Sequence, residues 1–278
     1  MSVSTVHVHL DERSYDVRIG HDLIANSGRE IMALLSRPRV AVLTDETVAR
    51  LHLGALKDGL AAEGIATSSL ALAPGEATKS WAGLERAVEW LLDERIERKD
   101  VVVALGGGVI GDLAGFAAAI LRRGVRFIQV PTSLLAQVDS SVGGKTGINS
   151  PHGKNLIGAF HQPSLVLADV GVLDTLTPRD FLAGYGEVVK YGLLGDADFT
   201  NMFVVLQEGS IAGPYETLAL AQEAGAVTLN YGLFINTIVS FLIVAFAIFL
   251  VIRSINHMQR EEEAAATEPT TKDCLHCF

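Results

Sequence analysis

Apolar and polar residues alternate with a period of two along residues 1–20, and this alternation predicts two short strands. Four apolar runs follow, and each leads into a segment with the 3.6-residue spacing of a helix. The four predicted strands lie within residues 37–48, 68–80, 100–107 and 125–131. Strands that alternate with helices predict an α/β fold with a Rossmann-like, mostly parallel sheet and helices on both faces. Such sheets bind ligands at the carboxyl ends of their strands.

The pattern changes near residue 198. Residues 224–252 carry no charge, and the part from Tyr231 to Ile252 is long enough to cross a bilayer. A buried core helix is the alternative, but the length of the run and its basic flank favour a membrane helix. The pattern therefore predicts one transmembrane helix that includes Tyr231–Ile252, followed by a polar tail that we expect to be disordered.

Composition narrows the function classes. The net charge of −10 argues against nucleic acid as a partner. The two cysteines, Cys274 and Cys277, leave the body of the chain without a disulfide framework, which suits a reducing compartment. The N-terminus has no apolar segment typical of a signal peptide. The tail motif Cys-Leu-His-Cys offers two metal ligands, or three with His276, which is fewer than a structural zinc site uses.

Three stretches carry candidate chemistry. In "VVVALGGGVIGD" an apolar strand ends in a glycine turn before a helix, where backbone N–H groups can approach a phosphate; a tight turn without a ligand is the alternative. "QVDSSVGGKTGINSPHGKNLIGAFHQP" places two lysines in glycine-rich loops, which suits a phosphate or carboxylate, or else a solvated loop. In "TPRDFLAGYGEVVKYGLL" Glu187 and Lys190 share a helix face, either as a surface ion pair or with Glu187 as a metal ligand.

Four motifs, in order, resemble 3-dehydroquinate synthase: "GGGVIGDLAGFAAA", "RGVRFIQVPTSLLAQVDSSVGGKTGIN", "GKNLIGAFHQP" and "EVVKYG". The resemblance covers residues 1–197. It implies a cytoplasmic, dimeric lyase of the shikimate pathway that acts on a seven-carbon keto sugar phosphate. In this family NAD transiently oxidises a ring hydroxyl, and zinc or another divalent metal polarises it.

The resemblance also implies roles for individual residues. The expected cofactor-binding residues are Asp45, Glu76, Lys79, Gly107, Gly108, Val109, Asp112, Thr132, Ser133, Lys154 and Thr175. The expected substrate-binding and catalytic residues are Asp139, Lys145, Asn155 and Lys190, and Glu187 is the expected first metal ligand. The family takes two further zinc ligands, both histidines, from a helical C-terminal domain, and nothing after Lys190 matches their motif. Because catalytic zinc sites use three protein ligands, we expect an incomplete metal site and no synthase activity.

The stretches "LNYGLFIN" and "FLIVAFAIFLVIRSIN" resemble a different family, the large-conductance mechanosensitive channel. This resemblance covers residues 198–278. It implies an extracytoplasmic loop at 198–228, a lipid-facing transmembrane helix at 229–252 in the inner membrane, a cytoplasmic polar tail at 253–278, and a homopentamer. The pore-lining first helix of that family has no counterpart here, so we expect no channel.

The two halves make incompatible demands on topology. Arg253 and Arg260 follow the predicted span, whereas residues 210–230 contain no lysine or arginine. The positive-inside rule then places the C-terminus in the cytoplasm and the enzyme-like half outside. Three interpretations remain open: a chimera joined near "GDADF" by recombination or assembly error, a genuine membrane-tethered NAD-binding module, and a scaffold or regulator without catalysis.

Overall fold

The computed structural model describes residues 3–196, 202–209, 215 and 217–266. They form two compact units, Met1–Tyr185 and Gly186–Phe278. The tail motif with Cys274, His276 and Cys277 lies outside the described residues, as does the junction at 197–201.

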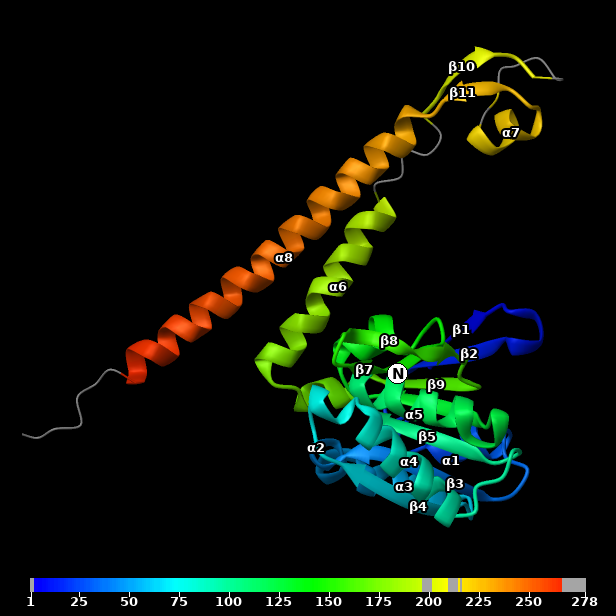
Figure 1. The fold of residues 1–278 in the computed structure, drawn as a ribbon, viewed down its shortest axis with the longest axis vertical. Helices are drawn as coiled ribbons and strands as arrows, with labels where there is room; N and C mark the ends of the chain where they lie inside the picture. The colour runs from blue at the N-terminus through cyan, green and yellow to red at the C-terminus, as the bar shows by residue number, and fades with distance from the viewer. Residues whose placement is uncertain (1–2, 197–201, 210–214, 216, 267–278) are drawn as a thin grey trace, which may run out of the picture. The chain divides into compact units, whose positions relative to one another are not determined.

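The first unit contains a seven-stranded sheet with the strand order β1-β2-β9-β6-β5-β3-β4 (Figure 1). Strand β1 pairs antiparallel with β2 at one edge, and every other pair is parallel. The strands are β1 Ser4–Val8, β2 Tyr15–Gly20, β3 Arg39–Asp45, β4 Ala66–Leu72, β5 Val101–Gly106, β6 Arg126–Pro131 and β9 Leu165–Asp169. The predicted Rossmann-like α/β fold is confirmed, and β9 adds a strand that we did not predict.

Helices cover both faces of this sheet because side chains of its central strand β5 alternate between two cores. Val102 and Ala104 join the core formed with α4 Trp81–Asp93 and α5 Gly108–Ile120. Val101, Val103 and Leu105 join the core formed with α1 Ser27–Met32 and α3 Gly54–Ala62. Shorter helical segments are η1 Asp11–Arg13, α2 Glu46–Val48, η2 Ala49–Leu53, η3 Glu76–Thr78, η4 Leu121–Arg123, η5 Ala136–Ser140 and η6 Val170–Thr175.

A β-hairpin occupies the stretch where we expected glycine-rich loops, and that prediction is wrong. Strand β7 Lys145–Ser150 pairs antiparallel with β8 Gly153–Phe160. Two of the glycines allow the strands to approach each other closely. A Cβ on Gly147 would collide with the Ile157 carbonyl oxygen, and a Cβ on Gly158 would collide with the Thr146 carbonyl oxygen. Lys145 and Lys154 therefore stand on strands.

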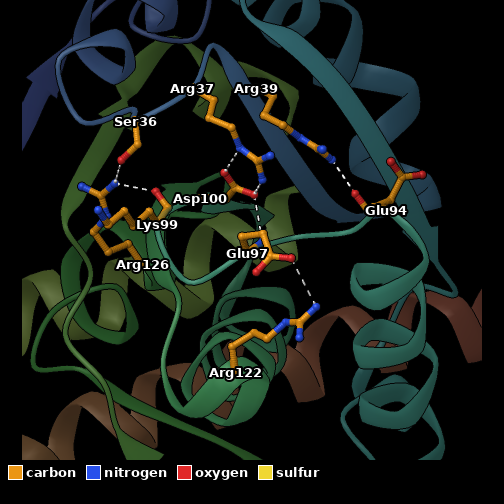
Figure 2. Close-up of polar contacts among 9 residues, drawn as sticks. All are labelled: Ser36, Arg37, Arg39, Glu94, Glu97, Lys99, Asp100, Arg122 and Arg126. Carbon is orange, nitrogen blue, oxygen red and sulfur yellow. Dashed lines mark hydrogen bonds and ion pairs between the residues drawn. The ribbon is translucent and has the colours of Figure 1, made fainter.

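Polar contacts tie together the amino ends of β3, β5 and β6 (Figure 2). The Asp100 carboxylate is buried, with 1% of its side chain exposed. It accepts hydrogen bonds from Arg37 Nε at 2.8 Å, from Arg37 Nη2, and from the Glu97 N–H at 2.9 Å. Arg39 and Arg126 donate to the carbonyl oxygens of Glu94 and Lys99 at 2.6 and 2.8 Å. Burial raises the pKa of Asp100, but its hydrogen bonds and the charges of Arg37 and Arg39 together outweigh burial and hold the pKa below its usual value.

The substitution Asp100→Asn is expected to lower the free energy of unfolding of this unit by about 2 kcal/mol at pH 7. The amide retains the shape but loses the charge and turns a donor toward Arg37. Because folding lowers this pKa, the stabilisation is present above the unfolded value and is lost as the pH falls through the folded value. Urea unfolding followed by tryptophan fluorescence measures it, since Trp81 and Trp90 both lie in this unit. The difference from the parent should shrink below about pH 4; a constant difference would contradict this account.

The second unit is mostly helical. It contains most of α6 Pro178–Asp196, the strand pair β10 Val204–Gln207 and β11 Val227–Leu229, and the helices α7 Leu218–Glu223 and α8 Tyr231–Ala266. The predicted disordered tail is wrong for residues 253–266, which continue α8; their glutamates and alanines are good helix formers. No helix within the described residues combines the length and apolarity of a membrane crossing, so the predicted span at 229–252 is not confirmed.

Candidate functional site

The glycine turn lies where β5 meets α5, at the carboxyl end of the sheet. The N–H of Thr132, which follows β6, donates to the Gly106 carbonyl oxygen at 3.0 Å, so the ends of these two strands are held together. Gly107 precedes α5 and Gly108 is its first residue. A Cβ on Gly107 would lie 3.3 Å from Ser133 Oγ, and one on Gly108 would lie 3.0 Å from Ser140 Oγ. The absence of side chains keeps the N-terminus of α5 open to an anion.

A cavity of about 390 Å³ opens beside this turn. It is bounded by the ends of β3, β5 and β6 and by the segment around η6. The structure brings seven of the predicted cofactor-binding residues to its wall: Asp45, Gly107, Gly108, Val109, Thr132, Ser133 and Thr175. These residues are far apart in the sequence, so the parallel sheet, which aligns its strand ends, creates this cavity.

Asp45 is the last residue of β3, lines the cavity and caps the N-terminus of α2. Its Oδ1 accepts hydrogen bonds from the N–H groups of Thr47 at 2.9 Å and Val48 at 3.0 Å. This capping fixes the carboxylate at the carboxyl end of β3. A second acceptor oxygen remains on the same group for a ligand hydroxyl.

His52 is a cavity residue that we did not predict. Its Nε2 lies 3.0 Å from Thr175 Oγ1, and that hydroxyl donates to the Val172 carbonyl oxygen at 2.7 Å. Burial lowers the pKa of His52 and outweighs the opposing effect of Asp169. The neutral ring therefore donates from Nε2, and Thr175 faces the cavity as an acceptor. A lone histidine in a helical segment gave no signal in the sequence.

A polar cluster of three predicted residues lies on the α4–α5 side of the sheet. Lys79 is buried, with 4% exposed, and its Nζ pairs with Asp112 Oδ2 and donates to Asn155 Oδ1. Burial raises the pKa of Asp112, while the hydrogen bond and charge of Lys79 oppose the rise and Asp139 adds to it. Asp139 lies on η5, close enough for its charge to act on Asp112. Buried charges of this kind must be paired to be tolerated.

Glu76 extends the cluster along the loop before α4. Its Oε1 accepts a hydrogen bond from Asn149 Nδ2 at 2.7 Å and lies 3.7 Å from Lys154 Nζ. The Asn149 hydrogen bond outweighs burial and, with the lysines, lowers the pKa of Glu76. A second cavity of about 340 Å³ is lined by Asp112, Lys145 and Asn155. The predicted substrate-binding lysine and asparagine thus share a cavity with a predicted cofactor residue.

Glu187 and Lys190 belong to the second unit. Both lie on α6, and Lys190 Nζ pairs with Glu187 Oε2 one turn away. Within the part of the chain that the structure describes, no three histidine, cysteine, aspartate or glutamate side chains come close enough to hold a metal ion.

A parallel sheet with a glycine turn and a cavity at its strand ends defines a Rossmann-like nucleotide-binding fold. Two families match the chain in succession, and both predicted resemblances are confirmed: "3-dehydroquinate synthase N-terminal" over residues 69–183 and "Large-conductance mechanosensitive channel, MscL" over residues 187–277.

Relatives and solved structures agree for the first part. The 3-dehydroquinate synthase of Paracoccus denitrificans is 70% identical over 224 residues, covering 81% of this chain and 60% of the relative. That of Ruegeria pomeroyi is 75% identical over 197 residues, covering 71% and 53%. The chain thus spans little more than half the length of these relatives.

Among solved structures, ValA, a 2-epi-5-epi-valiolone synthase from Streptomyces hygroscopicus with NAD+ and Zn2+ bound, is 32% identical with a TM-score of 0.62, covering 69% of this chain and 53% of ValA. A 2-deoxy-scyllo-inosose synthase complexed with carbaglucose-6-phosphate, NAD+ and Co2+ is 27% identical with a TM-score of 0.62, covering 68% and 52%.

Proposed function

We propose that the first unit binds NAD in the 390 Å³ cavity, with the pyrophosphate at the N-terminus of α5. The observation that carries this proposal is one cavity whose wall gathers seven of the residues expected for the cofactor, including Gly107 and Gly108 of the open glycine turn. The NAD+ bound in ValA and in the 2-deoxy-scyllo-inosose synthase supports it. Asp45 would accept from a ribose hydroxyl, and Thr175 would accept from a donor group of the adenosine end.

The 340 Å³ cavity is the proposed site for a sugar phosphate. Lys145 would pair with the phosphate, and Asn155 would bind a hydroxyl group. Asp139, whose charge acts on the cavity residue Asp112, would bind another hydroxyl group. The carbaglucose-6-phosphate bound by the 2-deoxy-scyllo-inosose synthase supports this substrate class. The chemistry that NAD supplies when bound is the transient acceptance of a hydride. The buried Lys79, paired with Asp112, would hold the Asn155 side chain in place, because it donates to Asn155 Oδ1.

We further propose that this chain does not complete the reaction of 3-dehydroquinate synthase. Glu187 is paired with Lys190, and MscL-like sequence follows it in place of the region that provides the other metal ligands in the synthase family. A site with one protein ligand would not retain zinc. We also propose that the synthase-like domain ends at residue 197. Within it, Glu187 corresponds to the first metal ligand and Lys190 to a substrate-binding residue.

Two measurements on the full-length chain test the proposal. Isothermal titration calorimetry with NAD is expected to show one site per chain, and phosphate release from the seven-carbon keto sugar phosphate with added zinc is expected to stay at the background rate. Failure to bind NAD would refute the cofactor proposal. Phosphate release with stoichiometric zinc would refute the proposed loss of activity.

A second function rests on the second unit. We propose that α8 contacts lipid at the inner membrane, because residues 187–277 match MscL and large apolar side chains of α8 are exposed. These side chains include Phe234, Phe241, Leu242, Phe246 and Phe249. Flotation with phosphatidylglycerol-containing vesicles should recover the full chain, and a variant with Phe241→Glu and Phe246→Glu should stay at the bottom of the gradient. Equal flotation of both proteins would contradict lipid contact through this face.

A further inference from the structure

Asn149 joins the β7–β8 hairpin to the loop before α4. Its N–H donates to the Lys79 carbonyl oxygen at 2.9 Å, its Nδ2 donates to Glu76 Oε1 at 2.7 Å, and its Oδ1 accepts from the Asn155 N–H at 3.0 Å. Both groups of the side-chain amide are used, and their partners lie 73 residues before it and 6 residues after it. These partners fix the orientation of the amide, because only Nδ2 can donate to a carboxylate.

The hairpin is irregular at this point. Ile148 pairs with Ile157 and Ser150 pairs with Gly153, so the single residue Asn149 faces three residues of β8. Asn155 is in the middle of those three and has a φ of 58°, a left-handed conformation that non-glycine residues rarely adopt. Its N–H, which a regular ladder would pair with a carbonyl oxygen, is bonded to the Asn149 side chain instead. That hydrogen bond therefore stabilises the unusual backbone conformation of Asn155.

The conformation of Asn155 determines where its side chain points. Asn155 Oδ1 accepts from Lys79 Nζ, which pairs with Asp112, and Asn155 and Asp112 line the same cavity. On its other side Asn149 holds Glu76, whose carboxylate also lies near Lys154. One amide thus connects groups expected to bind cofactor with a group expected to bind substrate.

We propose that Asn149 is a positioning residue that holds Asn155 and Glu76 in the geometry that ligand binding requires. The inference about ligands rests on the proposed NAD function. Aspartate cannot replace Asn149, since it accepts from Asn155 but has no donor for Glu76 and adds a second negative charge beside it. Alanine removes both contacts and leaves the Asn155 N–H without its acceptor.

The variant Asn149→Asp tests the proposal in the full-length chain. NAD binding measured by calorimetry is expected to weaken about tenfold, the effect of losing one hydrogen bond to a charged group. Amide hydrogen exchange in peptides covering residues 76–80 and 153–160 is expected to accelerate by a similar factor. Asn26→Asp is the matched control: it makes the same change at the start of α1, on the opposite face of the sheet, and should bind NAD like the parent.

The double variant Asn149→Asp with Glu76→Gln reverses donor and acceptor. The side-chain amide that Glu76→Gln introduces can donate to the new carboxylate, which still accepts from Asn155. Hydrogen exchange should therefore return toward the parent rate. This variant is judged by exchange alone, because Glu76 is itself an expected cofactor-binding residue. Parent-like exchange or parent-like binding in Asn149→Asp, or exchange in the double variant as fast as in the single one, would overturn the proposal. If the parent does not bind NAD, the proposed function fails, and the exchange measurements alone decide the role of Asn149.

Discussion

Replacing Lys79 with methionine is expected to weaken NAD binding at least about 100-fold and to lower the free energy of unfolding of the first unit by about 3 kcal/mol at pH 7.5. The ammonium of Lys79 is buried and serves both Asp112 and Asn155. Methionine fills a similar volume without a charge, so Asp112 would keep its carboxylate in a desolvated place without a cation. Removing one partner of a buried pair costs far more than the pair contributes.

The pH dependence of the destabilisation shows whether the unpaired charge of Asp112 causes it. Burial already raises the pKa of Asp112, and the loss of Lys79 removes the groups that oppose the rise. A carboxyl whose pKa is raised by folding is accommodated well below its unfolded pKa, and stability falls as the pH rises through the folded value. The destabilisation by Lys79→Met should therefore be much smaller at about pH 4, near the ordinary pKa of aspartate, than at pH 7.5.

Urea unfolding followed by tryptophan fluorescence at the two pH values measures the effect on stability, and calorimetry measures NAD binding. Lys99→Met is the matched control, because Lys99 is exposed and its backbone carbonyl, not its side chain, accepts from Arg126. A destabilisation of Lys79→Met that is equal at both pH values would show that packing, and not the charge of Asp112, is responsible.

Local patterns were sufficient to predict most of the sheet. Apolar runs followed by helical spacing gave β3, β4, β5 and β6 with the helices after them, because burial on both sides of a parallel sheet leaves a continuous apolar signal. The glycine turn was visible for the same reason: a strand that ends in consecutive glycines before a helix leaves few alternatives. The motif resemblance then supplied the residues that the cavity gathers.

Contacts between distant segments could not be predicted in this way. Gly147 and Gly158 look like loop residues until the two strands lie against each other. The side chain of Asn149 gains its role from Glu76, and His52 from Thr175, 123 residues away. Lys79 has the sequence context of an exposed loop lysine, and only the packing of α5 and the hairpin around it produces a buried ion pair. In each case the contact that gives the residue its role forms only when distant segments of the chain pack together.

The substitution Gly108→Asp should lower the affinity for NAD at least about 100-fold, while the first unit remains folded. Gly108 is the first residue of α5, and an aspartate there suits the helix dipole. Its Cβ would lie 3.0 Å from Ser140 Oγ, a contact that a small rotation of the serine side chain relieves. The new carboxylate would occupy the anion position at the N-terminus of α5 and repel a pyrophosphate.

Gly54→Asp is the control that separates charge from position. Gly54 is the first residue of α3, which follows η2 without a break, so its N–H groups are not a free helix N-terminus; nothing lies within 4 Å of a Cβ built on it. Both variants add one negative charge to the same unit, so a general electrostatic effect would weaken NAD binding equally in the two proteins. Retained binding in Gly54→Asp together with lost binding in Gly108→Asp, at unchanged unfolding midpoints, would place the anion at the start of α5. Retained binding in Gly108→Asp would show that the pyrophosphate lies elsewhere, and the proposed use of the glycine turn would then be wrong.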